Sequence, residues 1–333
     1  MRTVMKIIQY GIGPIGQKIT RLLLKKTGCE IVAAIDIDPE KKGRSLGDIV
    51  GQPDALDVPV QDDAARTLSS AAADIVVLTT SSTLESIAPQ ILEIVSHGLN
   101  VVTTCEELAY PMRTNPELAA KLDQAARLNN VSILSTGINP GFLMDFLPAT
   151  LTGICVSVDT VRIERFQNAQ MRRIPFQQKI GAGLSTAEFQ ERVEKKTLRH
   201  VGLTESIHMI ADALGWELTK TEDIIEPVIA TERVVTPDLT IEPGFALGVN
   251  QTGRGFIGER EVISLLFRAA IGEKDPRDRI IVNGEPSIDS TIKGGINGDI
   301  GTCSITVNAV PAVIKARPGL RTMIDIESIT CFA

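Results

Sequence analysis

The feature that most constrains the fold of this 333-residue chain is a glycine pattern near its N-terminus. Residues 11–16 read G-I-G-P-I-G, and they follow an apolar run at residues 4–10 that is typical of a buried parallel strand. A helical pattern begins at Ile15, and Asp36 stands 20 residues after Gly16, at the end of a second β-branched run. A strand, a glycine loop, a helix and an acidic residue in this order predict a dinucleotide-binding βαβ unit.

Each residue of the loop has a physical role in such a unit. Gly11 permits the tight turn, Gly13 lets the backbone approach a pyrophosphate, and Gly16 lets the helix and the strand pack closely. Pro14 and Ile15 open the helix, whose free N–H groups and positive dipole end attract phosphate. We therefore expect these five residues to bind the cofactor.

The choice between NAD and NADP depends on Asp36. Its carboxylate would accept hydrogen bonds from the adenosine ribose hydroxyls and repel a 2′-phosphate, which favours NAD. Lys41, Lys42 and Arg44 follow closely and could neutralise such a phosphate. A solvated helix end explains these basic residues equally well, so NADP stays the alternative to NAD.

Strand and helix patterns alternate through the rest of the N-terminal part. Short apolar, β-branched runs predict further strands at residues 30–36, 74–80, 100–104 and 131–135. Amphipathic stretches between them predict helices at residues 15–25, 84–96 and 116–129. This alternation predicts right-handed βαβ units and a doubly wound parallel sheet of the Rossmann type.

After about residue 140 the pattern changes to that of an α+β domain with a largely antiparallel sheet. Residues 156–166 alternate apolar and polar, as an antiparallel strand does, and a capping box that begins at Ser185 predicts a helix. Another helix is expected at 204–214, and further strands at 224–235, 239–249, 255–267, 278–283 and 286–292. We therefore predict a dinucleotide-binding domain at 1–140, completed by a C-terminal helix at 303–333, and a substrate-binding domain at 141–302.

Composition argues against several classes of protein. The chain has only three histidines and no H-E-x-x-H or paired C-x-x-C pattern, so no metal site is expected. Five cysteines, odd in number and far apart, favour a reducing cytoplasm over a disulfide framework. No apolar stretch reaches the roughly 18 residues of a membrane span, and the first apolar run is too short for a signal peptide. A net charge of −7 without a basic stripe argues against a nucleic-acid partner.

Ligands of open α/β sheets lie at the carboxyl ends of the strands, where several polar residues are expected. Thr80 and Ser81 could contact the nicotinamide ribose or only cap the next helix. Glu106 and Glu107 follow the next strand, where a carboxylate under apolar cover would have a raised pKa and could exchange protons or hold an ammonium group. The plainer alternative is one exposed glutamate and one at a helix N-terminus. Cys105 is a conceivable nucleophile, but acylating dehydrogenases pair such a cysteine with a histidine base, and the two neighbouring carboxylates would raise its pKa.

Other candidates belong to the substrate side. Residues 135–142 follow the last strand of the first domain, where the two domains are expected to meet. His200 could bind substrate, or it could cap or pack at the start of a helix. Arg162 and Arg165 stand three apart on an alternating strand, so only one of them can face the site. The remaining candidates for anchoring a substrate carboxylate are Arg172 and Arg173.

Five stretches in order along the chain resemble the 2,4-diaminopentanoate dehydrogenases and the related native amine dehydrogenases. They read IIQYGIGPIGQKI, VVTTCEELAYP, STGINPGFLMD, HVGLTESIHMIADALGW and NAVPAVIKARPGL. The resemblance implies a Rossmann domain, a dihydrodipicolinate-reductase-like second domain whose sheet pairs with a second copy in a homodimer, and interconversion of an amine with a ketone and ammonia by a nicotinamide cofactor. It assigns proton transfer to a glutamate of the C-E-E-L segment, so to Glu106 or Glu107, of which Glu106 lies nearer the strand end. It also implies substrate contacts for Asn139 and Phe142, and for His200 in the H-V-G-L motif.

Other activities stay open at this point. Dihydrodipicolinate reductases carry a His-His pair and a lysine-bearing loop, and the matching region here reads KIGAGLSTAEF from Lys179, which argues against lysine-pathway reduction. One alternative is an NAD(P)-dependent dehydrogenase or reductase that acts on a hydroxyl or C=N substrate without free ammonia. Another is a non-catalytic module that senses the dinucleotide. The motifs do not decide which amine is the substrate, or whether it carries a carboxylate.

Overall fold

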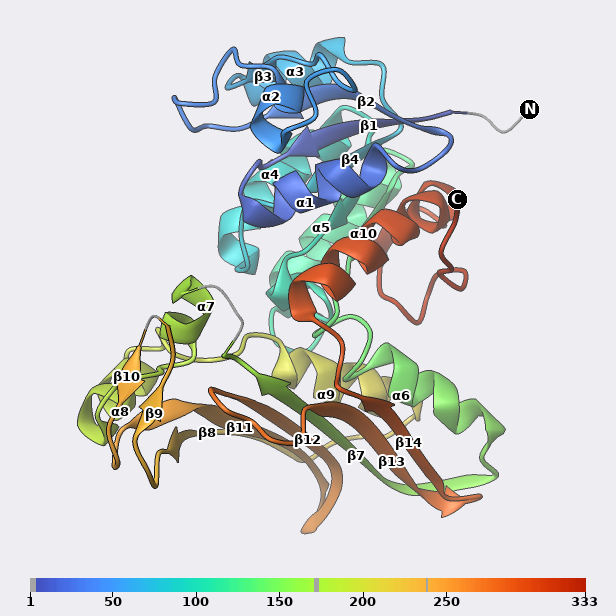
Figure 1. Ribbon diagram of the computed structural model, residues 1–333. Coiled ribbons are helices and arrows are strands. Elements are labelled where there is room, and N and C mark those ends of the chain that lie inside the picture. Colours follow the sequence, from blue (N-terminus) through green and yellow to red (C-terminus); the bar gives the residue numbers. More distant parts are fainter. Residues whose placement is uncertain (1–3, 171–173, 238) are drawn as a thin grey trace. The chain divides into compact units, whose positions relative to one another are not determined.

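The computed structural model describes residues 4–170, 174–237 and 239–333 (Figure 1). The chain divides into two compact units, one made of Met1–Phe142 with Gly298–Ala333 and the other of Leu143–Asn297. Among the described residues, no helix is both long and apolar enough to cross a membrane.

The first unit is built on a seven-stranded sheet in the order β15-β6-β5-β4-β1-β2-β3, and every pair of neighbours in it is parallel. The strands are β1 (Met5–Tyr10), β2 (Cys29–Ile35), β3 (Val60–Gln61), β4 (Ile75–Leu78), β5 (Asn100–Thr103), β6 (Ser132–Ser135) and β15 (Gly319–Arg321). The helices are α1 (Pro14–Leu23), α2 (Leu46–Val50), α3 (Ala64–Ser70), α4 (Leu84–Ser96), α5 (Pro116–Leu128) and α10 (Gly298–Lys315), with a 3-10 turn η1 (Glu106–Leu108). The predicted doubly wound parallel sheet is confirmed.

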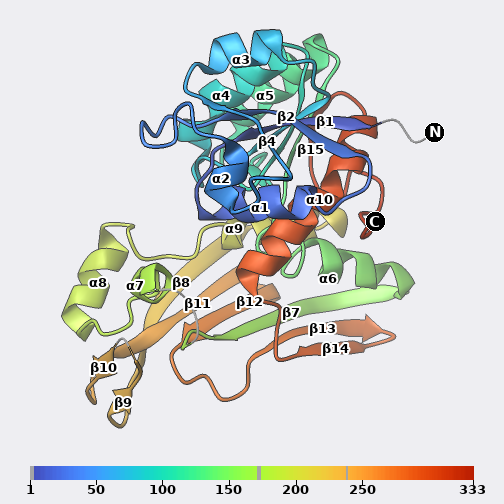
Figure 2. The same ribbon diagram turned by 45° about the horizontal axis from the view of Figure 1, so that its top comes forward.

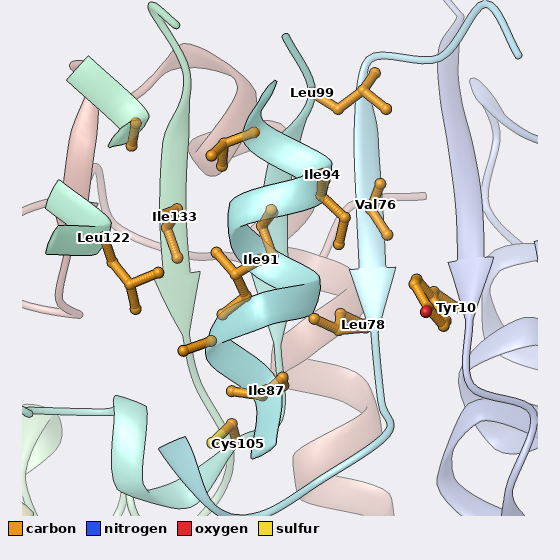
Figure 3. Packing of buried hydrophobic residues seen from close by; sticks show 14 of the residues in the cluster. Tyr10, Val76, Leu78, Ile87, Ile91, Ile94, Leu99, Cys105, Leu122 and Ile133 are labelled. Atoms are coloured by element: carbon orange, nitrogen blue, oxygen red, sulfur yellow. The ribbon is translucent and has the colours of Figure 1, made fainter. Parts of the chain in front are cut away.

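Helices cover both faces of this sheet, which explains why its strands are mostly apolar. All four residues of β4 are fully buried. On one face, Ile87, Ile91 and Ile94 of α4 pack against Val76 and Leu78 of that strand (Figure 3). On the other face, α10 packs beside α1 and against β5 and β6 (Figures 1 and 2). Packing on both faces therefore fixes the central strands in place. The candidate residues follow the carboxyl ends of these strands.

The second unit is built on a six-stranded sheet in the order β14-β13-β7-β12-β11-β8. Its strands are β7 (Ser157–Asn168), β8 (Lys220–Ile229), β11 (Ala246–Ile257), β12 (Arg260–Ala270), β13 (Arg277–Glu285) and β14 (Ile288–Lys293), and β9 (Val234–Val235) pairs with β10 (Thr240–Ile241) apart from it. The helices are α6 (Phe146–Leu151), α7 (Ile174–Lys179), α8 (Thr186–Glu194) and α9 (Leu203–Ala213), with a 3-10 turn η2 (Thr152–Ile154). The predicted capping box starts α8, because Ser185 and Glu188 bond each other's backbone.

The predicted largely antiparallel sheet of the second unit is confirmed, because four of its five neighbouring pairs are antiparallel. The exception is β7, which is antiparallel to β13 but parallel to β12, and the limits of some strands also differ from expectation. The expected break between residues 249 and 255 is wrong, since β11 runs through it and turns only after Ile257. Gly253 and Gly255 lie inside that strand, at the place where α9 packs on the sheet. A Cβ on either glycine would stand only 3.0 Å from Ile207, so the absence of a side chain lets the helix approach closely.

The C-terminal segment also differs from expectation. The helix predicted within 303–333 is α10, which begins earlier, continues through Pro311 and ends at Lys315. The chain then adds β15 parallel to β6 at the edge of the first sheet. A strand of three residues depends on its partner in the sheet more than on its own sequence, and for that reason the sequence pattern did not indicate it.

Candidate active site

The glycine loop between β1 and α1 has the geometry expected of a phosphate-binding turn. Gly11 has a φ of +89°, and a Cβ there would stand 2.8 Å from the backbone oxygen of Thr79. A Cβ on Gly16 would overlap the carbonyl oxygen of Gly11, so the close approach of helix and strand requires glycine. Gly13, by contrast, has open space where a Cβ would point.

The N-terminus of α1 suits an anionic ligand. Gly13 is its N-cap and supplies no side chain to the first amides, Pro14 occupies the first turn, and no acidic residue lies in that turn. The amide groups and the positive end of the helix dipole are therefore available to a pyrophosphate. The residues present fit a dinucleotide on three counts: two glycines without room for a side chain, one open glycine, and an uncapped helix start.

Asp36 ties the loop to the second strand. Its Oδ2 accepts hydrogen bonds from the backbone N–H of Ile12 at 2.6 Å and from Lys41 Nζ at 3.1 Å, and its Oδ1 accepts one from the N–H of Asp38 at 2.9 Å. Lys41 is also 3.1 Å from Asp38 Oδ2. Burial lowers the pKa of Lys41, but its bonds to both carboxylates raise the pKa overall. Asp36 thus has a structural role in the loop, and a lysine stands beside it.

Thr80 and Ser81 follow β4, the neighbour of β1 in the sheet. A Cβ on Gly11 would stand 2.9 Å from Thr80 Cγ2, so Thr80 lies directly against the glycine loop. Its hydroxyl donates to Gln90 Oε1 at 2.5 Å, and Ser81 Oγ accepts from the N–H of Thr83 at the start of α4. The structure therefore brings Thr80 to the loop, while Ser81 bonds to the start of the next helix.

Glu106 and Glu107 open η1 at the carboxyl end of β5, beside β4, and both are half-buried. Their carboxylates differ in what they contact. Glu107 Oε2 accepts a hydrogen bond from the backbone N–H of Leu84 at 2.9 Å and so caps α4, whose own N-cap Thr83 makes no side-chain bond to the helix backbone. No hydrogen bond or ion pair joins the Glu106 carboxylate to any residue that the structure describes.

Cys105 precedes the two glutamates and is fully buried. Burial raises the pKa of its thiol to about 12, and the charges of Glu106 and Glu107 also raise it. The thiol is therefore protonated at neutral pH, which removes it as a nucleophile. Across the described segments, no group of three or more His, Cys, Asp or Glu residues could hold a metal ion.

The segment after β6 turns tightly at the same edge of the first sheet. Asn139 is buried and Phe142 is half-buried. The start of α10 holds this turn, because the Ile138 N–H donates to Thr302 Oγ1 at 3.2 Å. Thr136 is a residue that the motifs did not single out. Its buried Oγ1 has no hydrogen-bond partner among the described residues, and a bound ligand could satisfy it.

In the second unit His200 is held by a polar network around the buried Gln251 side chain. The Gln251 side chain accepts from the His200 N–H at 2.7 Å and donates to the His200 carbonyl at 3.0 Å. The same amide donates to both oxygens of Asp223, at 2.8 and 3.0 Å, and burial raises the pKa of that carboxyl. The His200 ring stacks on Phe267, with 4.4 Å between ring centroids. The structure therefore fixes the histidine on the face of the sheet that carries Phe267.

The arginines considered as carboxylate anchors lie elsewhere. Arg165 is buried and paired with Asp278 at 2.6 Å. Arg162 is half exposed and is 2.9 Å from Glu164. Arg172 and Arg173 lie outside the described residues.

Strand register shows which face of the sheet Arg162 occupies. Glu164 is paired with Leu266 on β12, so Arg162 and Glu164 share a face with Leu266, and Phe267 points to the other face. The structure therefore does not bring Arg162 together with His200.

The sequence matches two described families in order. Residues 5–105 match the dihydrodipicolinate reductase N-terminus, and residues 142–333 match the 2,4-diaminopentanoate dehydrogenase C-terminal domain. A 2,4-diaminopentanoate dehydrogenase of Acetoanaerobium sticklandii is 35% identical over 331 residues, which cover 96% of this chain and 93% of that protein. The chain belongs to the 2,4-diaminopentanoate dehydrogenase family. The resemblance expected from the five sequence stretches is thereby confirmed.

Two further relatives agree with membership of the 2,4-diaminopentanoate dehydrogenase family. An amine dehydrogenase of Streptomyces virginiae is 23% identical and covers 96% of this chain and 95% of its own length. The solved structure of an amine dehydrogenase from Mycobacterium smegmatis is 27% identical, with a TM-score of 0.86 over 99% of this chain and 98% of that one. The expected α/β fold is confirmed across both units.

Proposed function

We propose that the chain is an NAD(P)-dependent amine dehydrogenase, which reversibly converts an amine to a ketone and ammonia. The observation that carries the proposal is the difference between the contacts of two adjacent glutamate carboxylates. Glu107 is engaged as the cap of α4, whereas the half-buried Glu106 carboxylate stands at the same sheet edge as the glycine loop without a protein partner among the described residues. A carboxylate in that position suits both proton transfer and contact with a cationic nitrogen.

NAD or NADP would be held by the glycine loop and the start of α1, with Asp36 at the adenosine ribose and Thr80 and Ser81 near the nicotinamide side. When bound, the cofactor supplies or accepts the hydride at the carbon that bears the nitrogen. We favour NAD because Asp36 is a carboxylate. NADP is the alternative, because Lys41, whose Nζ lies 3.1 Å from Asp36 Oδ2, could pair with a 2′-phosphate.

The protein's part in the reductive direction is proton transfer. Ammonia adds to the ketone to give a carbinolamine, and Glu106 donates a proton to the hydroxyl that leaves as water. The Glu106 carboxylate then stabilises the resulting iminium ion until hydride reaches its carbon and yields the amine. In the oxidative direction the steps run backward, with Glu106 as the base that activates water.

We propose substrates of the 2,4-diaminopentanoate type or simple alkyl amines, with contacts from Asn139, Phe142 and His200. The family relation and the fixed position of His200 on Gln251 and Phe267 support this assignment. We do not extend it to Arg162, which lies on the other face of its sheet. A homodimer is part of the proposal, and light scattering of the purified chain tests it.

The experiment is a steady-state amination screen with NADH and NADPH. It compares 2-amino-4-oxopentanoate with unfunctionalised ketones, each with and without ammonium. We expect oxidation of the reduced cofactor only when ketone and ammonium are both present. Ketone turnover without ammonium would instead indicate a hydroxyl dehydrogenase, and cofactor binding without turnover on any substrate would indicate a sensing module; either result overturns the proposal.

A further inference from the structure

A second site is suggested by a cavity of about 460 Å³ in the first unit, lined by Arg127, Arg317, Pro318 and Arg321. Arg127 lies in the last turn of α5, Arg317 and Pro318 lie in the connection from α10 to β15, and Arg321 is the last residue of β15. Arg127 precedes β6, Arg317 and Pro318 precede β15, and the Arg321 side chain turns back to the carbonyl oxygens of these last two residues. The cavity therefore lies at the amino ends of these two parallel strands. The glycine loop and Glu106 follow the carboxyl ends of β1 and β5, so they lie at the other end of the parallel strands.

The charges around the cavity do not balance. Three arginines line it, and Asp123 is the carboxylate that pairs with two of them, Arg127 and Arg321. Asp123 already accepts from Arg127 Nε at 2.6 Å and from the backbone N–H of Leu320 at 2.9 Å, and it stands 3.8 Å from Arg321. The Arg317 side chain is exposed and has no hydrogen bond or ion pair with a described residue. An excess of two positive charges therefore surrounds the cavity, in a chain whose net charge is −7.

The backbone fixes one of these guanidinium groups in place. Arg321 is 11% exposed, and its guanidinium donates to the carbonyl oxygens of Arg317 at 3.0 Å and Pro318 at 2.6 Å. Gly319 has a φ of +126°, and a Cβ there would overlap the Arg321 guanidinium and stand 2.5 Å from Asp123 Oδ1. The glycine thus lets the guanidinium lie against the chain, so a binding group is held in position before any ligand arrives.

We propose that this cavity binds a small anion that carries a phosphate group. The planar fork of a guanidinium matches the oxygens of phosphate, and the excess of two charges matches a dianion. The negative ends of the helix dipoles of α5 and α10 also stabilise nearby arginines, but they do not account for Arg321, whose Nε and Nη2 bond to the connection while its Nη1 has no hydrogen bond with a described residue. The proposal is independent of the amine dehydrogenase activity, because this cavity lies at the amino ends of the strands and the candidate active site lies at their carboxyl ends.

The experiment titrates the full chain with inorganic phosphate at constant ionic strength and follows calorimetric binding and the thermal unfolding midpoint. The glycine loop can also bind phosphate, so the variants assign the site. Arg317→Ala removes an exposed side chain and leaves the fold intact, which its unfolding midpoint without phosphate checks. Lys121→Ala is the matched control, since it removes an exposed positive charge from the same helix α5 without lining the cavity.

We expect Arg317→Ala to weaken phosphate binding about tenfold or more, the effect of losing one charge-assisted pair, while Lys121→Ala binds as the wild type does. Arg127→Ala should weaken it similarly. Equal phosphate affinity of Arg317→Ala and Lys121→Ala would overturn the proposal. Equal stabilisation of the wild type by chloride at the same ionic strength would also overturn it, because that result would mean general screening.

Discussion

Replacing Asp36 separates its structural role from its role toward the cofactor. The carboxylate accepts the backbone N–H groups of Ile12 at 2.6 Å and Asp38 at 2.9 Å, and it pairs with Lys41. Asp36→Ala removes all three interactions and should destabilise the fold even without a dinucleotide. Asp36→Asn is the matched control, since it keeps an acceptor oxygen for Ile12 and loses the charge and the bond to the Asp38 N–H.

The magnitude follows from which groups are left without a partner. The Ile12 N–H is fully buried, and an unpaired buried donor costs about 1–3 kcal/mol. Lys41 keeps its ion pair with Asp38, so no lone buried charge adds to that cost. We therefore expect Asp36→Ala to lower the free energy of unfolding by about 2–3 kcal/mol and Asp36→Asn to lower it by less than about 1 kcal/mol.

Urea denaturation measures the stability change, and fluorescence titration with NADH and NADPH measures the cofactor preference. Both Asp36 variants should shift the affinity ratio toward NADPH, because both remove the charge that repels a 2′-phosphate. If the free energy of unfolding of Asp36→Ala lies within about 0.5 kcal/mol of the wild-type value, the structural role assigned to this carboxylate is refuted.

Three further predictions concern an ion pair, two cysteines and a carboxyl group. Arg165→Met should lower the free energy of unfolding, measured with urea, by about 3–5 kcal/mol, because it leaves the buried Asp278 carboxylate uncompensated. The control Arg162→Met removes a half-exposed side chain and should lower it by less than about 1 kcal/mol. Equal losses would contradict the burial of the first pair. Iodoacetamide at neutral pH should label exposed Cys331 well before Cys105, whose pKa of about 12 keeps it protonated, and mass spectrometry of the labelled chain would refute this if both react together. Partial burial raises the pKa of Asp223, so its contribution to stability is present at acid pH and is lost as the pH rises. Asp223→Asn should gain stability relative to the wild type as the pH rises above about 4, and a constant difference in urea midpoints would oppose this.

The parts of the fold that local patterns specify could be predicted from the sequence. The central strands of the first unit are buried on both faces and therefore appear as short apolar runs, and α4 begins and ends at the expected residues despite Pro89. Long-range pairing was not predictable in the same way. The strand β15 exists because Gly319–Arg321 meets β6, and β7 pairs with β12 in parallel although its alternating pattern suits either direction.

The same limit applies to the candidate site. The glycine spacing and the position of Asp36 specify a dinucleotide loop, because each residue acts within one βαβ unit. The motifs could not separate Glu106 from Glu107, since the difference depends on the N–H of Leu84, 23 residues away in the chain. They also could not show that Asp36 bonds to Ile12, because that contact forms only when β2 lies beside the loop.

The central claim is that Glu106, and not Glu107, transfers the proton. The most direct measurement is the steady-state rate of reductive amination by Glu106→Gln and by Glu107→Gln. In the second variant the amide oxygen can still accept the Leu84 N–H, so the cap of α4 is preserved. We predict that Glu106→Gln lowers kcat by about 10²–10⁴-fold with an unchanged unfolding midpoint, while Glu107→Gln stays close to the wild type. A near-normal rate for Glu106→Gln, or equal losses in both variants, would contradict the account.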